Sequence, residues 1–142
     1  MNIRIATKKD INSIVEIHQA AFKGFFLTSL GGRFLKIYYT TFIKCQKGVI
    51  FCAEKDGKIV GFSACSYISQ GFNTFLIKKN FCKFGLVCVE LMFTNPKAIL
   101  RLAKNLDKKA EGNAVADNGE YAELYSIAVM PGNQGSGIGK KL

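Results

Sequence analysis

Residues 124–139 read LYSIAVMPGNQGSGIG and hold the most informative pattern of the chain. Residues 121–130 predict a strand, and Pro131-Gly132-Asn133 predicts a turn after it. The glycines that follow lead into a helix that starts just before the last residue of the sequence. A strand, a glycine-rich turn and a helix start bring unpaired backbone N–H groups together, so this stretch predicts a cradle for phosphate.

Two familiar glycine loops do not fit this spacing. A Walker loop needs G-x-x-x-x-G-K-[ST], but Gly137 is followed by Ile138, and no glycine stands five residues before Gly139. A dinucleotide-binding fingerprint needs G-x-G-x-x-G near the start of a β-α-β unit. Here glycines stand at positions 135, 137 and 139, and only three residues follow them. Both of these phosphate sites are therefore excluded.

The stretch instead resembles the acetyl-CoA signature of the GNAT N-acetyltransferases, a strand followed by [QR]-x-x-G-x-[GA]. Gln134, Gly137 and Gly139 stand at its three defining positions. Residues 53–62 look like the hairpin of the family's second and third strands, and the strand–helix–helix order before them matches the family's N-terminal half. The resemblance leaves out residues 73–119. It implies an α/β (α+β) fold, with a mixed and mostly antiparallel sheet flanked by helices.

The resemblance also implies acetyl-CoA as the acyl donor. The backbone amides around the glycines would hold the CoA pyrophosphate, with Gln134 shaping the turn, and the backbone of Ile127 and Val129 would pair with the pantetheine arm like an added strand. The implied cofactor-binding residues are Ile127, Ala128, Val129, Gln134, Gly135, Ser136, Gly137, Ile138, Gly139 and Lys140.

Catalysis by such an enzyme would be direct attack of a primary amine on the thioester. This reaction needs orientation, oxyanion stabilisation and a proton acceptor. By resemblance to family members with a glutamate on this strand, Glu123 is the expected general base and Glu120 the second candidate; that both are solvated carboxylates stays open. The family's usual general acid, a tyrosine, would lie beyond Leu142, so Tyr125 is not assigned that role.

Charge and composition bound the alternatives. The sequence has 20 Lys and Arg against 10 Asp and Glu, a net charge of +10, which favours an anionic partner. A nucleic-acid binder would rest on this charge alone, and a polyphosphate donor already explains part of it. The leading hypothesis is an N-acetyltransferase acting on a small molecule, sugar or peptide amine. The alternative is a non-catalytic CoA-binding or protein-interaction module.

Working outward, the N-terminal half predicts a strand and two helices. Ile3 and Ile5 alternate as in a short strand, and Thr7 with Asp10 resembles a capping box before a helix over 11–22. His18 borders the apolar stripe of that helix, which favours a packed histidine over a catalyst. Residues 23–33 predict an apolar loop, either a pocket wall or a segment under the core, and a second helical stripe runs from 34 to 45.

The middle of the chain predicts a hairpin followed by a helical insertion. Two apolar runs, 48–54 and 59–69, flank the Asp56-Gly57 turn signal, and Gly61 predicts a bulge or a close backbone approach. Residues 73–109 predict two helices, interrupted at Asn95-Pro96, that shape the acceptor pocket or a dimer contact. Their apolar stretch, 84–93, is too short to span a bilayer, and burial in the chain's own core is favoured over a membrane surface or another chain.

Length and cysteines complete the prediction. A chain of 142 residues holds one domain, 1–142, with 73–109 as an insertion within it and a polar loop over 108–120. The family continues beyond this glycine loop, so we expect either a shortened form of a longer protein or an assembly, such as a homodimer, that covers the strand before the loop. The five cysteines form no C-x-x-C pair, which favours the reducing cytoplasm, and with one histidine a metal site is not expected.

Overall fold

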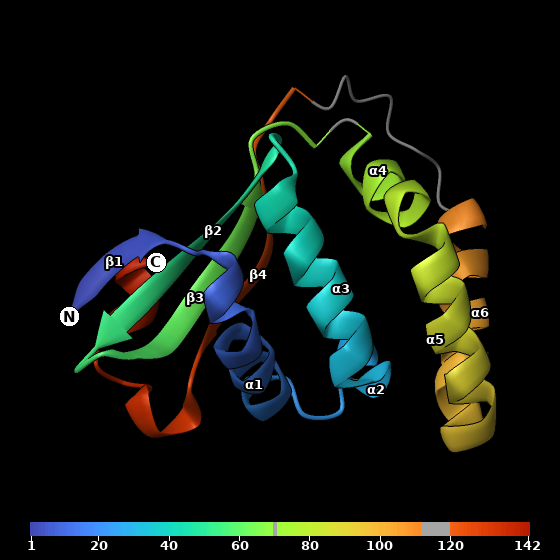
Figure 1. Ribbon diagram of the computed structural model, residues 1–142, viewed down its shortest axis with the longest axis horizontal. Coiled ribbons are helices and arrows are strands. Elements are labelled where there is room, and N and C mark those ends of the chain that lie inside the picture. The colour runs from blue at the N-terminus through green and yellow to red at the C-terminus, as the bar shows by residue number, and fades with distance from the viewer. Residues whose placement is uncertain (70, 112–119) are drawn as a thin grey trace.

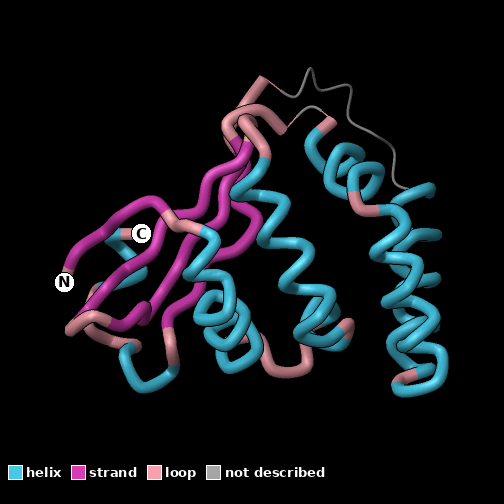
Figure 2. The backbone as a smooth tube through the Cα atoms, in the orientation of Figure 1, coloured by secondary structure: helices cyan, strands magenta, loops and turns pink. Residues whose placement is uncertain are grey.

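Four strands form one antiparallel sheet in the order β1-β2-β3-β4 (Figures 1 and 2). The structure is a computed structural model that describes residues 1–69, 71–111 and 120–142. The strands are β1 (Asn2–Ile5), β2 (Gly48–Lys55), β3 (Lys58–Ser66) and β4 (Glu123–Val129). Each described strand pairs antiparallel with the next one along the chain, which confirms the expected kind of sheet.

Helices lie on both faces of the sheet. On one face, α1 (Ile11–Ala21) and α3 (Gly31–Lys44) pack against the side chains of Cys52, Phe62 and their neighbours. On the other, the short α7 (Ile138–Lys141) buries Ile138 against Ala53 and Val60. Consecutive residues of a strand point to opposite faces of the sheet. Cys52 therefore packs toward α1 and α3, and Ala53 packs toward α7.

The core between α1, α3 and the sheet is rich in aromatic rings. Tyr39, Phe42, Phe62 and Phe72 are fully buried and meet at centroid distances of 4.9–6.2 Å, most of them edge to face. His18 packs into the same core, 2% exposed, with its Nδ1 2.6 Å from the Tyr39 hydroxyl. Burial lowers the pKa of His18 to about 4, which agrees with the expected packed histidine.

The prediction of a loop over residues 23–33 is wrong. This segment holds α2 (Phe26–Ser29) and the first turn of α3, and Leu30 between them is buried. A Cβ on Gly32 would lie 3.5–3.7 Å from side-chain atoms of Gln19 and Val15. The glycine therefore lies at the contact of α1 with α3, where a small residue allows two helices to approach.

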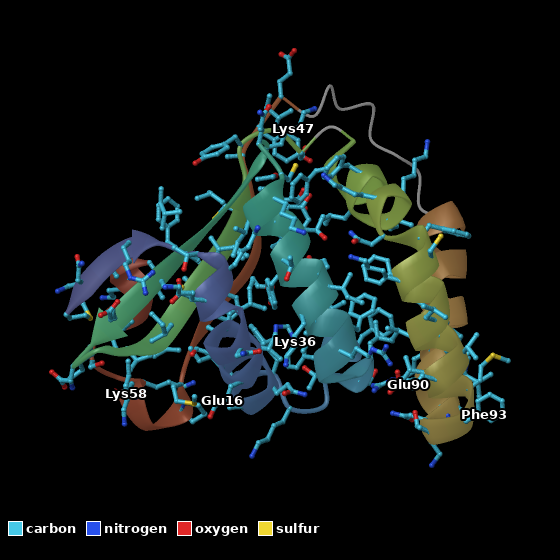
Figure 3. The ribbon with its side chains drawn as sticks, in the orientation of Figure 1. Glu16, Lys36, Lys47, Lys58, Glu90 and Phe93 are labelled. Carbon is cyan, nitrogen blue, oxygen red and sulfur yellow. The ribbon has the colours of Figure 1, made fainter. Side chains whose placement is uncertain are left out.

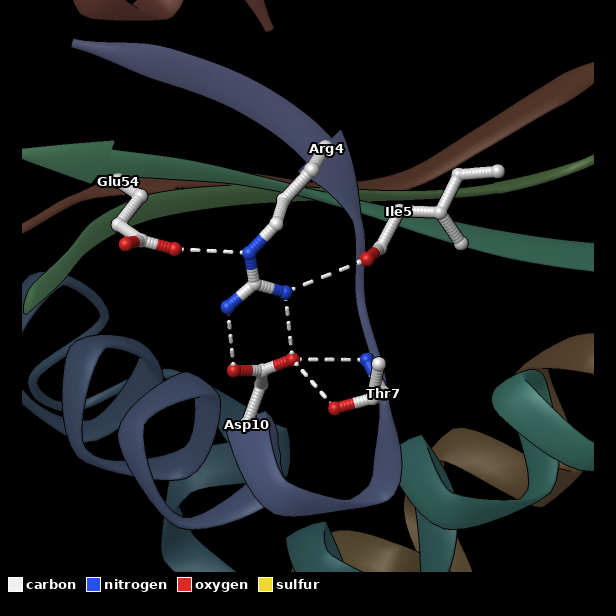
Figure 4. Close-up of polar contacts among 5 residues, drawn as sticks. All are labelled: Arg4, Ile5, Thr7, Asp10 and Glu54. Carbon is white, nitrogen blue, oxygen red and sulfur yellow. Dashed lines mark hydrogen bonds and ion pairs between the residues drawn. The ribbon is translucent and has the colours of Figure 1, made fainter. Parts of the chain in front are cut away.

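A partly buried polar cluster joins β1 to the start of α1 (Figure 4). The Arg4 guanidinium donates two hydrogen bonds of 2.8 Å to the Asp10 carboxylate and one of 2.8 Å to Glu54 on β2. Asp10 also accepts hydrogen bonds from the backbone N–H and the hydroxyl of Thr7, at 2.7 and 2.9 Å. The Arg4 guanidinium and these Thr7 bonds hold the Asp10 pKa well below its usual range, although burial opposes them. The expected capping box is thus confirmed.

The hairpin of β2 and β3 turns at Asp56-Gly57, both with positive φ, as the Asp-Gly signal predicted. The register between these strands shifts at Ala53/Glu54, opposite Gly61 and Ile59, which is the bulge expected near Gly61. A Cβ on Gly61 would lie 3.0 Å from Leu142 Cδ1 and 3.1 Å from the Ala128 carbonyl oxygen. Both features predicted at Gly61, a bulge and a close approach, are therefore present.

The helical insertion has three helices in its described part, not two. They are α4 (Phe72–Lys79), α5 (Phe81–Thr94) and α6 (Pro96–Glu111). Asn80 ends α4 because its buried side-chain amide donates to the Leu76 carbonyl and to the Thr41 hydroxyl of α3. Asn95 separates α5 from α6, which begins at Pro96, so the helices are interrupted where expected. The polar loop predicted over 108–120 is wrong for its first residues, which belong to α6 up to Glu111, and its residues 112–119 lie outside the described part of the chain.

The apolar stretch 84–93 is only half buried, contrary to the expectation that it packs into the chain's own core. One side of α5 packs Val87 and Leu91 against Leu30 and Ala98. The opposite side leaves Leu86 64% and Phe93 85% exposed, and Phe93 points away from the rest of the molecule (Figure 3). In the described ranges no helix combines the length and the apolar character needed to cross a bilayer.

Candidate acetyl-CoA site

The glycine turn presents a row of backbone amides. The hydrogen bonds of the turn use the amides of Asn133, Gln134 and Lys140. Within the described part of the chain, no backbone carbonyl accepts from the amides of residues 135–139. Gly135 and Gly137 have φ angles of +79° and +76°, a conformation that L side chains rarely adopt. These two glycines therefore allow the turn that leaves five consecutive amides available to an anion.

Two side chains hold the turn. Gln134 Nε2 donates a 3.1 Å hydrogen bond to the Val129 carbonyl, and Ser136 Oγ donates a 2.7 Å bond to the Asn133 carbonyl. The first bond joins the turn to the last residue of β4, and the second closes the turn on itself. Gln134 thus connects the turn to the end of β4.

The outer edge of β4 is open beside the turn. Met130 N–H donates 2.8 Å to the Val60 carbonyl of β3. Because backbone groups alternate along a strand, the N–H and C=O groups of Ile127 and Val129 face the other way, away from β3. In the described ranges β4 is the last strand of the sheet, so this edge has no strand paired with it. An extended amide chain could add here as a further strand.

A concavity of about 290 Å³ lies at the turn. Its lining includes most of the predicted cofactor residues: Val129, Gln134, Gly135, Gly137, Ile138, Gly139 and Lys140. Ile127 lies further along β4 and is 37% exposed, whereas Ala128 is buried opposite Phe62. The concavity also includes Asn133, which sequence reasoning missed because its only signal is its place in the turn.

Glu123, the candidate base, lies at the opposite end of β4 from the glycine turn. It pairs in register with Ser66 of β3 and is half-buried. Burial raises the pKa of Tyr125, and the nearby Glu123 carboxylate raises it further. The six steps along the backbone from Glu123 to Val129 span about 20 Å at roughly 3.3 Å each. A ligand extended along β4 from the turn would therefore carry its far end toward Glu123.

The described residues contain no group of three or more His, Cys, Asp or Glu side chains that could hold a metal ion. The site described above offers backbone amides, an open strand edge, the exposed Lys140 and the Glu123 carboxylate. Such a set can bind a diphosphate, align an amide-containing arm and accept a proton.

Comparison with known sequences identifies the family. The model of the acetyltransferase (GNAT) family matches residues 11–142. The chain belongs to the GNAT family. The match starts after β1 and includes the helical insertion and the glycine turn. No curated protein matches the sequence of this GNAT chain.

A solved structure agrees with the fold of this GNAT chain. It is the apo crystal structure of the aminoglycoside antibiotic 6′-N-acetyltransferase AAC(6')-IG from Acinetobacter haemolyticus. The two share a TM-score of 0.56 at 11% sequence identity, with 99% of this chain covered. The match covers 65% of the acetyltransferase, so this GNAT chain spans slightly less than two thirds of its length. At this identity the likeness concerns the fold, and it confirms the expected GNAT architecture.

Proposed function

We propose that this chain is an N-acetyltransferase that moves the acetyl group of acetyl-CoA to a primary amine of a small molecule, sugar or peptide. The observation that carries the proposal is the continuity of the glycine turn with the open edge of β4. Gln134 joins the two through its hydrogen bond to the Val129 carbonyl. With its diphosphate bound by the turn amides, CoA would place its pantetheine arm beside the backbone of Ile127 and Val129.

The chemistry follows from this placement. The amine nitrogen attacks the thioester carbonyl, a C–N bond forms, the C–S bond breaks, and CoA leaves as its thiolate. A backbone N–H of β4 directed at the developing oxyanion would stabilise it, and a single such donor contributes about 3 kcal/mol to catalysis. Glu123 would take the amine proton directly or through a water, with Glu120 as the second candidate.

Three further features complete the proposal. The chain works with acetyl-CoA and an amine acceptor, and the insertion, residues 73–109, shapes the acceptor pocket or a homodimer contact. We place the enzyme in the cytoplasm, which is supported by the absence of disulfides among the five cysteines, all of them within the described ranges. Removal of the insertion that changed neither the acceptor preference nor the number of subunits in the assembly would refute its role.

The test has two steps. Titration calorimetry with acetyl-CoA measures binding, and a thiol-release assay over a panel of amines of varied charge measures transfer. Binding with release of CoA supports the proposal. Binding without release for every amine supports the alternative, a non-catalytic CoA-binding module. No binding of acetyl-CoA would refute both, because each depends on the glycine turn.

A further inference from the structure

A second basic concavity lies on the other side of the molecule, between α3 and the junction of α4 with α5. It has a volume of about 250 Å³ and is lined by Lys36, Lys44, Lys79 and Lys83 together with four uncharged residues. Lys36 and Lys44 are two helical turns apart on α3, so both face the groove from one helix face. Lys79 and Lys83 face it from the opposite wall. None of its lining residues borders the glycine turn.

Contacts between α3 and the helices opposite it fix the spacing of the two walls of this lysine groove. At one end, Asn80 Nδ2 donates 2.7 Å to Thr41 Oγ1, which itself donates 2.8 Å to the Ile37 carbonyl. Thr41 and Asn80 are 4% and 7% exposed, so this floor is buried. Further along α3, the Phe34 ring stacks on Phe84 of α5 at 4.7 Å. The groove is therefore a formed feature of the helix packing.

A further ion pair spans the same two helices. Arg33 Nη1 lies 2.6 Å from a carboxylate oxygen of Glu90, which faces α3 from α5 (Figure 3). Glu90 is the only acidic residue of α5, and it pairs with an arginine that does not line the groove. The pair thus adds to the spacing of the helices without neutralising the lysines.

The charge of the lysine groove is uncompensated within the described part of the chain. No residue that lines the groove is acidic. The ion pairs of the described residues join Arg4 to Asp10 and Glu54, and Arg33 to Glu90, so none of them involves a lysine of the groove. Lys79 is positioned by the Phe75 ring, whose centroid lies 4.9 Å from its Nζ. Four like charges around one small space repel each other, and an anion bound between them relieves that repulsion.

We propose that the lysine groove binds a small phosphorylated ligand that carries two or more negative charges. Its volume is just below the range of ordinary small-molecule pockets, which suits a phosphate monoester or diphosphate. The hydroxyl of Thr40 adds a neutral polar group to the lining, whereas the Asn80 amide donates to Thr41 and Leu76 and serves as part of the floor. This site is separate from the proposed acetyl-CoA site and does not depend on that proposal.

The test is calorimetric titration of the full chain with pyrophosphate, and of a Gly137→Val background that removes binding at the glycine turn. Pyrophosphate affinity should persist in that background and fall at least about tenfold in Lys36→Gln/Lys83→Gln. The control Lys8→Gln/Lys55→Gln has the same net charge, changes two exposed lysines outside both concavities, and should change affinity less than twofold. Circular dichroism verifies that each variant is folded.

The remaining outcomes overturn the proposal. Equal losses in both double variants would show general attraction by the net charge. Absence of pyrophosphate binding in the Gly137→Val background would show that the groove binds no such anion. Tighter binding of a single-stranded oligonucleotide through Lys36 and Lys83 would identify a nucleic-acid surface instead. Acetyl-CoA affinity, measured separately, decides the proposed function independently.

Discussion

The side-chain amide of Gln134 donates a 3.1 Å hydrogen bond to the backbone carbonyl of Val129. This bond connects the first residue of the glycine signature to the last residue of β4. Since it is solvent-exposed, its contribution to overall stability is small. Its importance is geometric, because it keeps the turn amides in line with the open strand edge.

Replacing Gln134 should therefore weaken acetyl-CoA binding without changing stability. Gln134→Ala is expected to lower affinity about threefold to tenfold, since one hydrogen bond contributes about 0.5–1.5 kcal/mol. Gln134→Arg keeps a donor at the signature position and should stay within about twofold of the wild type. Calorimetry measures both. An equal loss in both variants would contradict the role of the Val129 bond.

The positive φ of Gly137 makes that position intolerant of a side chain. Gly137→Ala should cost about 1–2 kcal/mol in the bound conformation of the turn, or roughly tenfold or more in acetyl-CoA affinity. Gly132→Ala is the matched control, because Gly132 lies in the same turn region, has no positive φ and has open space around it. If Gly132→Ala weakens binding as much, left-handed geometry is not the cause.

Glu123 is expected to affect the rate and leave donor binding unchanged. Glu123→Gln should reduce kcat by about 10²- to 10⁴-fold, the usual contribution of a general base. The acetyl-CoA Kd should stay within twofold, because Glu123 lies at the end of β4 far from the glycine turn. Glu120→Gln is measured in parallel by thiol release. A rate loss in Glu120→Gln alone would transfer the role of base to Glu120.

Burial of His18 predicts a pH-dependent stability. Its pKa falls from an ordinary value of 6.5 to about 4 in the folded chain, so the unfolded state binds the proton more readily. The stability associated with neutral His18 is complete above pH 6.5 and is lost as the pH falls toward 4. Urea unfolding at several pH values measures this, and His18→Gln should flatten the curve in that window. An unchanged slope in His18→Gln would exclude His18 as its source.

The Arg4–Asp10 cluster should contribute measurably to stability. Asp10→Asn removes the charge that accepts four hydrogen bonds from Arg4 and Thr7, and is expected to cost roughly 2 kcal/mol of unfolding free energy. Because the pKa of Asp10 is lowered in the folded chain, this stabilisation is lost only as the pH falls below about 3.8. That range lies below the pH range in which His18 affects stability. Lys9→Gln changes an exposed neighbour and should have little effect. A similar loss from Lys9→Gln would argue against the cluster.

The local elements and the glycine turn could be predicted from the order of residues alone. The Asp56-Gly57 hairpin, the capping box at Thr7 and the signature at Gln134, Gly137 and Gly139 depend on neighbouring residues and on backbone conformation. The conformation of a turn or a cap depends on residues that are neighbours in the sequence, so these predictions agree with the structure. The family match over residues 11–142 agrees with the same signature.

Which apolar surfaces are covered became clear from the packing of the helices in three dimensions. The stripe of α5 was expected in the core, yet Leu86 and Phe93 are exposed, because whether a helix face is covered depends on elements distant in the sequence. The break at Asn80 arises from a bond to Thr41, 39 residues away. The same long-range packing of α3 against α4 and α5 assembles the lysine groove, whose four charges look like scattered surface lysines in the sequence.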